Sequence, residues 1–207
     1  MRSRLGGLVA ALLWAGCAEP QTAYKRDFDF RNVRRVAVLA FSGQGGEAAA
    51  DHLLTSLLQS GADVVERRQL GALLKETRLG REGALDPRTM LEIGHLLGVD
   101  AIFAGSVTSY SPAQSYLVFA DAAGKRPTPL ASPLVISRGP AVGVPGSDVV
   151  TSAASVGLSA RMVDVQTGSV VWSAQLNYEG IDADAAMVQI CRSFVRSLRP
   201  VWLSPSR

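Results

Sequence analysis

The sequence predicts an α/β domain of three-layer type with a mixed sheet, and three observations predict it. The continuous apolar run Val36 to Phe41 has the pattern of a strand that is buried on both faces. Segments with helical spacing and further short strands follow this run, in the order of a βαβααβ unit. Near the C-terminus, a long alternating segment, a turn and an amphipathic helix indicate a β-hairpin followed by a final helix.

The first half of the chain is expected to supply its elements in a regular order. Leucines at helical spacing mark the first helix, a glycine follows it as a C-cap would, and an Asp-Pro pair opens a later helix. The expected elements are a helix around 53–58 that Gly61 ends, a strand at Val64–Val65, a helix over 67–79, a helix from Asp86-Pro87 to Gly98 and a strand over 99–108. Alternation of this kind predicts right-handed crossovers, with helices covering the sheet.

The second half begins with an insertion, residues 111–150, that contains six prolines among many Gly, Ser and Ala residues. Because proline lacks a backbone donor, long central strands are disfavoured there. From Ala154 to Met162 every second residue is apolar, which indicates a strand. A turn at Gln166–Gly168 then leads into a return strand from Val170 to about Tyr178. Asp182 is expected to cap the last helix, which Pro200 ends.

The N-terminus has the organisation of an export signal. Basic residues Arg2 and Arg4 precede an apolar stretch of about ten to twelve residues, which is too short for the roughly twenty that a membrane-spanning helix needs. Ala15-Gly16-Cys17 resembles the bacterial lipobox, in which the cysteine is acylated and becomes the mature N-terminus, although Trp14 and Leu13 depart from the commonest pattern. We favour lipidation of Cys17 over ordinary secretory cleavage near Gly16.

The expected segments divide the chain into a signal peptide (1–16), a lipidated, irregular tether (17–32), one domain (33–200) with its Pro-rich insertion, and a tail (201–207). Removal of Arg2 and Arg4 lowers the formal net charge from +3 to about +1, so nothing favours nucleic acid as a partner. With Cys17 lipidated, Cys191 would be the only thiol and no internal disulfide could form. Its place on the apolar face of the last helix favours a buried, unreactive side chain.

No residue pattern supports catalysis or a cofactor other than the covalent lipid on Cys17. The loop Gly43–Gly46 could hold a phosphate at a helix N-terminus, but no Gly-Lys-Ser/Thr follows it, and we favour a tight turn. His52 and His95 have no partner at ligand spacing, which disfavours a metal site. For Glu66-Arg67-Arg68 we favour a local ion pair at a strand-to-helix corner over an active-site acid. No serine is distinguished as a nucleophile.

Four segments in order resemble the CsgG family of lipoproteins, which includes the curli secretion channel. They read VAVLAF, VVERRQLGALLKE, LGVDAIFAGSVT and ARMVDVQTGSVVWSAQ, and their order and spacing agree with the family over residues 36–109 and 155–198. The fold is also similar to that of the TolB N-terminal domain and of LpoB-type lipoproteins. The resemblance assigns family-motif or structural roles to Val65, Glu66, Arg67, Leu70, Leu74, Gly105, Ser106, Asp164, Gly168 and Trp172.

The resemblance implies a non-enzymatic lipoprotein at the periplasmic face of the outer membrane, where Ala18 after the lipidated cysteine also directs it by the sorting rule. It would bind the membrane through its lipid, assist export or assembly of an envelope or surface component, and self-associate, with a ring as the expected form, or bind another envelope protein. Because the insertion is Pro-rich and no second hairpin follows Trp172, we do not expect a full curli-type pore. The alternative is a monomeric LpoB-like module that activates a cell-wall synthase.

Overall fold

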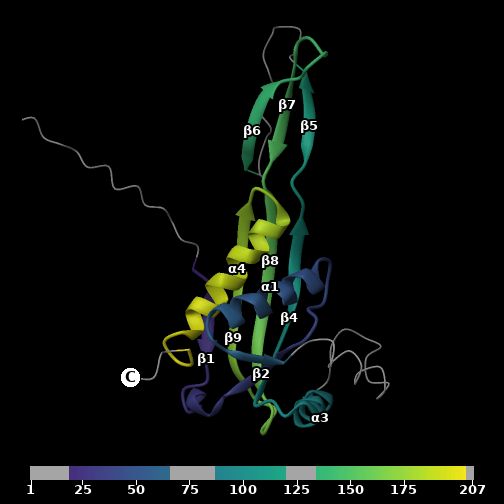
Figure 1. Cartoon of the computed structure of the whole chain (residues 1–207). Helices are drawn as coiled ribbons and strands as arrows, with labels where there is room; N and C mark the ends of the chain where they lie inside the picture. The colour runs from purple at the N-terminus through teal and green to yellow at the C-terminus, as the bar shows by residue number, and fades with distance from the viewer. Residues whose placement is uncertain (1–18, 66–86, 120–133, 204–207) are drawn as a thin grey trace, which may run out of the picture.

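A computed structural model of the chain describes residues 19–65, 87–119 and 134–203. Two sheets and three α-helices make up this part of the molecule (Figure 1). The strands are β1 (Gln21–Tyr24), β2 (Arg35–Val38), β3 (Asp63–Val65), β4 (Ala101–Ser111), β5 (Ser115–Phe119), β6 (Val135–Pro140), β7 (Ser147–Ser152), β8 (Ala154–Asp164) and β9 (Val170–Gly180). The helices are α1 (Gly46–Gln59), α3 (Pro87–Leu97) and α4 (Ala183–Leu198), with a 3₁₀ turn η1 at Phe30–Asn32.

The main sheet is mixed, as the sequence predicted, with the strand order β1-β9-β8-β4-β2-β3. Strand β2 is parallel to both β3 and β4, which reflects the crossover connections between them. On its other side β4 is antiparallel to β8, β8 is antiparallel to β9, and β9 is antiparallel to β1. Strands β8 and β9 form the expected hairpin. The helix expected over 67–79 lies outside the described residues, as does the Asp86 cap.

Two apolar cores on opposite faces of the sheet give the domain its three layers. Val36 and Val38 of β2 belong to the larger core under α1 and α4. Ala37 and the following Leu39 belong to a smaller core, against which Leu97 of α3 packs. Successive residues of a strand point to opposite faces, so a continuous apolar run is what a strand covered on both sides requires. The prediction of a doubly buried strand is confirmed.

The helix ends follow the expected chemistry. Gly61 has a φ of +85°, a left-handed conformation that glycine adopts without a Cβ clash, and it follows Ser60, the C-cap of α1. The side chain of Asp182 accepts a hydrogen bond of 2.7 Å from the Ala185 amide, which caps α4. No helix within residues 19–65, 87–119 and 134–203 has the length and apolar character needed to cross a membrane.

The N-terminal segment differs from the expected irregular tether. Residues Gln21–Tyr24 form β1, which pairs antiparallel with β9 from Gln175 to Trp172. The buried Phe30 of η1 belongs to the larger core and meets Phe28 edge-on, with ring centroids 4.9 Å apart. Strand β1 is short and mostly polar, so its pairing with β9 rather than its own pattern makes it a strand.

The insertion forms a second sheet, here called the distal sheet, with the order β5-β7-β6. The antiparallel register of β4 and β8 continues into it without a slip, from the pair Ser111↔Ser155 to the pair Ser115↔Thr151. The distal sheet therefore extends the β4–β8 ladder beyond the helices (Figure 1). Its strands have five or six residues, which agrees with the expected absence of long strands, but the sequence did not predict the sheet itself.

Candidate functional site

The family-motif residues that the structure describes have roles in the fold rather than in a binding site. Asp164 ends β8, is 7% exposed, and accepts hydrogen bonds from the amide and hydroxyl groups of Thr167. Gly168 follows with a φ of +68°, and its amide donates to the Asp164 carbonyl at 2.9 Å. Together they close the β8–β9 hairpin. Val65 is buried in the smaller core, while Cys17, Glu66, Arg67, Leu70 and Leu74 lie outside the described residues.

Gly105 and Ser106 lie where β4 is crowded on both sides. A Cβ on Gly105 would stand 2.5 Å from the carbonyl oxygen of Ser159 and 2.6 Å from the Phe41 ring. Ser106 forms a parallel bridge with Ser42, which keeps the chain after β2 beside β4. The glycine therefore permits β4 to lie close to both β8 and the Phe41 ring, so its role is in packing.

Trp172 is the aromatic centre of the larger core. Its ring is fully buried and meets the rings of Phe103 and Phe194 edge-on, with centroids 6.0 Å away in both cases. Its indole N–H has no hydrogen-bond partner among the described residues. The motif residue thus joins the sheet to α4 through apolar contact.

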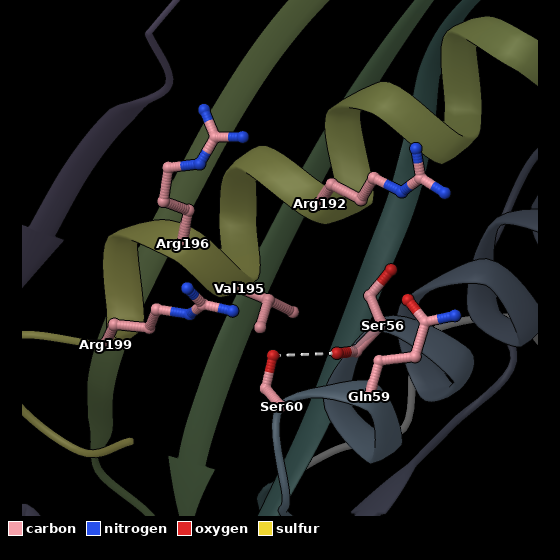
Figure 2. Close-up of a pocket in the computed structure, with 7 residues that line it drawn as sticks. All are labelled: Ser56, Gln59, Ser60, Arg192, Val195, Arg196 and Arg199. Carbon is pink, nitrogen blue, oxygen red and sulfur yellow. Dashed lines mark hydrogen bonds between the residues drawn. The ribbon is translucent and has the colours of Figure 1, made fainter. Parts of the chain in front are cut away.

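The functional candidate is a cavity of about 210 Å³ between the C-terminal halves of α1 and α4. Its lining consists of Ser56, Gln59, Ser60, Arg192, Val195, Arg196 and Arg199. In Figure 2, Arg192 and Arg199 extend from α4 toward α1, whereas the guanidinium of Arg196 points away from α1. The Ser60 hydroxyl donates to the Ser56 carbonyl at 3.0 Å, as the dashed line shows. This cavity is cationic on one wall and carries uncharged polar groups on the other.

We call Arg192, Arg196 and Arg199 the arginine surface. All three residues are exposed. Arg196 follows Arg192 by four residues and Arg199 follows Arg196 by three, which places them on one side of α4. No carboxylate within the described ranges forms a salt bridge with Arg192 or Arg196. Guanidinium groups bind carboxylates and phosphates in a bidentate way, so this wall has the chemistry to hold an anionic group. Sequence reasoning missed it, although the spacing was visible in the last helix.

The other ends of the same helices are acidic. Glu47 and Asp51 are exposed on α1, four residues apart, and Asp184 is exposed near the start of α4. The Asp184 carboxylate lies 2.7 Å from Nε2 of His52, which joins the two helices at this end. We call Glu47, Asp51 and Asp184 the acidic surface. His52, which the sequence left without a partner, therefore contacts a carboxylate.

The remaining candidate residues are built into the fold. Burial raises the pKa of the Cys191 thiol to about 12, and its sulfur lies 3.5 Å from the Ala49 carbonyl oxygen, so the thiol stays protonated near neutral pH. In the glycine loop, the Gly46 amide donates to the Gly43 carbonyl at 3.1 Å, which is the tight turn that we favoured. Over the described part of the chain, no three His, Cys, Asp or Glu side chains gather where a metal ion could be held.

Exposed apolar side chains gather on the distal sheet. Leu117 and Val149 are directly opposite each other on β5 and β7, and both are more than a third exposed. Further exposed apolar residues of this region are Phe119, Leu134, Val135, Ile136, Val142 and Val144. Surfaces of this kind mark contacts with other molecules more often than isolated exposed side chains do.

Three solved structures are similar to this chain at low sequence identity. The PelC dodecamer from Paraburkholderia phytofirmans has a TM-score of 0.47 at 16% identity, covering 91% of this chain and 98% of that one. The lipoprotein GNA1162 from Neisseria meningitidis has a TM-score of 0.46 at 14% identity, covering 79% and 94%. The LpoB C-terminal domain from Salmonella enterica has a TM-score of 0.40 at 13% identity, covering 72% and 84%.

No curated protein sequence matches the chain. The profile of the family described as "Curli production assembly/transport component CsgG" matches residues 28–193. This match spans most of the domain, from just before η1 into α4, and includes the distal sheet. Of the residues that line the cavity between α1 and α4, it includes Ser56, Gln59, Ser60 and Arg192. The chain belongs to the CsgG family.

Proposed function

We propose that this protein is a lipid-anchored component of the Gram-negative cell envelope that assists export or assembly of a surface component, by binding other molecules and by associating with itself. The family match over residues 28–193 carries this proposal. The export signal that ends in Ala15-Gly16-Cys17 supports lipidation, and Ala18 supports sorting to the periplasmic face of the outer membrane. The non-enzymatic role is inferred from the family.

The position of β1 supports close attachment to the bilayer. Only Ala18, Glu19 and Pro20 separate Cys17 from the first residue of β1. An extended chain spans at most about 3.3–3.6 Å per residue, so Gln21 would stay within about 14 Å of an acylated Cys17. A domain held on so short a link is suited to partners in or beside the same membrane.

The distal sheet supports a role in binding. Its exposed apolar side chains stand beyond the layer of helices, at the far end of the β4–β8 ladder. Burial of apolar area stabilises contacts by roughly 25 cal/mol per Å², so these side chains favour association over free exposure.

The anchor is tested by mass spectrometry of the mature protein purified from membranes. We expect an N-terminal Cys17 that carries acyl chains, and we expect Cys17→Ala to leave the membrane fraction. Cys191→Ala is the control, because its buried thiol takes no part in anchoring, and it should fractionate as the wild type does. An unmodified Cys17 sulfur in the native protein would contradict the proposal.

Self-association is tested separately by native sizing of the detergent-extracted protein. We expect a species larger than one chain. A clean monomer at all concentrations would remove self-association from the proposal and leave the anchoring result untouched.

A further inference from the structure

The charges of the α1/α4 layer are separated into two surfaces at its opposite ends. The arginine surface lies at the C-terminal end of α4, and the acidic surface lies where the N-terminal parts of α1 and α4 meet. Along α4, Asp184 and Arg196 are about 18 Å apart at 1.5 Å per residue. That distance exceeds the Debye length of about 8 Å at physiological salt, so the two surfaces do not neutralise each other within one chain.

The arginine surface has the chemistry to receive a carboxylate. Within the described ranges, Arg192 and Arg196 form no salt bridge with a carboxylate. Opposite Arg192, α1 presents Ser56 and Gln59 across the cavity (Figure 2). The cavity volume of about 210 Å³ is below the roughly 300–1,000 Å³ of small-molecule sites, so it suits a side chain better than a whole ligand.

The acidic surface carries the carboxylates that the arginine surface could bind. Asp184 has a side-chain exposure of 71%, and its carboxylate is hydrogen-bonded to His52 at 2.7 Å. Glu47 and Asp51 lie on the same helix as His52, in its first two turns, and both are exposed. Carboxylates are among the groups that guanidinium groups bind most strongly, through paired charge-assisted hydrogen bonds.

We propose that the arginine surface of one copy of this chain binds the acidic surface of the next copy. This inference rests on the proposed self-association and names the contact that produces it. The two surfaces differ, so the contact is head-to-tail, and each added copy leaves one surface of each kind at the ends. Such contacts close into a ring when the rotation between copies permits it, and otherwise run on as a filament.

Charge reversal on the full-length, detergent-extracted protein tests this contact. One variant carries Arg192→Glu and Arg196→Glu, and a second carries Asp51→Arg and Asp184→Arg. We expect each variant alone to need at least tenfold higher concentration to associate, because each now presents like charges at the contact. Arg161→Glu is the matched control, since Arg161 is exposed on β8 outside both surfaces, and it should associate as the wild type does.

Complementation separates a lost contact from a lost fold. A mixture of the two variants should associate again, because the unchanged acidic surface of the first faces the unchanged arginine surface of the second. A single chain with all four substitutions should also recover association. Circular dichroism and thermal unfolding of each variant check that the domain is folded, and raised salt should weaken association of the wild type.

Three outcomes would overturn the inference. The first is association of both charge-reversal variants at wild-type concentrations, which would place the contact elsewhere. The second is failure of the mixture and of the fourfold variant to recover although both are folded. The third is stabilisation of the wild type by inorganic phosphate that Arg192→Glu/Arg196→Glu abolishes without any effect on association, which would make the occupant a small anion. Lipidation of Cys17 is measured independently, so none of these results bears on the anchor.

Discussion

The indole ring of Trp172 meets the phenyl ring of Phe194 edge-on, with the ring centroids 6.0 Å apart and the planes at 78°. Both side chains are completely buried, and the contact fixes α4 on β9. The final helix, which carries the arginine surface, is therefore positioned by an aromatic contact in the core.

Phe194→Ala should lower the free energy of unfolding by about 3–5 kcal/mol. The substitution removes the ring that packs on Trp172 and leaves a cavity that the sheet cannot close. Urea denaturation measures the effect. Leu58→Ala on α1 is the control, because Leu58 is 51% exposed, and it should change stability by less than about 0.5 kcal/mol. Equal effects of the two substitutions would contradict the assigned packing.

Gly105→Ala should destabilise the domain by about 1–3 kcal/mol or more. Its Cβ would meet the Ser159 carbonyl oxygen and the Phe41 ring, and the backbone oxygen belongs to the adjacent strand, so relief requires a shift of β8. Gly139→Ala on β6 is the matched control, since a Cβ there has no atom within 4 Å. Thermal unfolding of the pair should show a clear loss for Gly105→Ala alone.

A chain that begins at Asp27 should be less stable than one that begins at Glu19 by about 1–3 kcal/mol, because it loses the β1–β9 ladder. It should also scatter more light at high concentration, because β9 would become an exposed edge strand that can pair with other chains. Equal free energies of unfolding and equal light scattering of the two chains would show that β1 does not stabilise the sheet.

Cys191 should make stability fall with pH in the alkaline range. Burial raises the thiol pKa from 9.0 to about 12 in the folded chain, so the unfolded chain releases its proton first. The free energy of unfolding therefore keeps its full value below pH 9 as far as this thiol is concerned. Between pH 9 and 12 it falls by up to about 1.4 kcal/mol per pH unit, because the unfolded chain ionises while the folded chain does not. Urea denaturation between pH 8 and 10.5 should show a shallower decline for Cys191→Ala than for the wild type. Parallel curves would argue against a buried neutral thiol.

Elements with a strong local pattern were predictable from the sequence. The apolar run of β2, the alternation of β8 and the Asp182 cap of α4 each satisfy a rule that acts within a few residues. The CsgG resemblance is also carried by segments of this kind, and the family match agrees with it.

Elements that depend on distant partners were not predictable. The polar strand β1 exists because Trp172 to Gln175 of β9 pair with it, and the distal sheet exists because the β4–β8 register continues past Ser111. The residues of a short strand have little intrinsic preference for extended structure, so the sequence patterns of β1 and of the distal sheet did not indicate strands.

The sequence by itself determined the α/β class, the core positions and the cationic spacing of Arg192, Arg196 and Arg199, because each follows from the periodicity of one element. Only the tertiary structure decided that these arginines share a cavity with Ser56 and Gln59, and that Asp184 joins His52 at the other end of the layer. The physical reason is that a binding surface is made by packing helices that are far apart in the chain, and packing is set by the whole core.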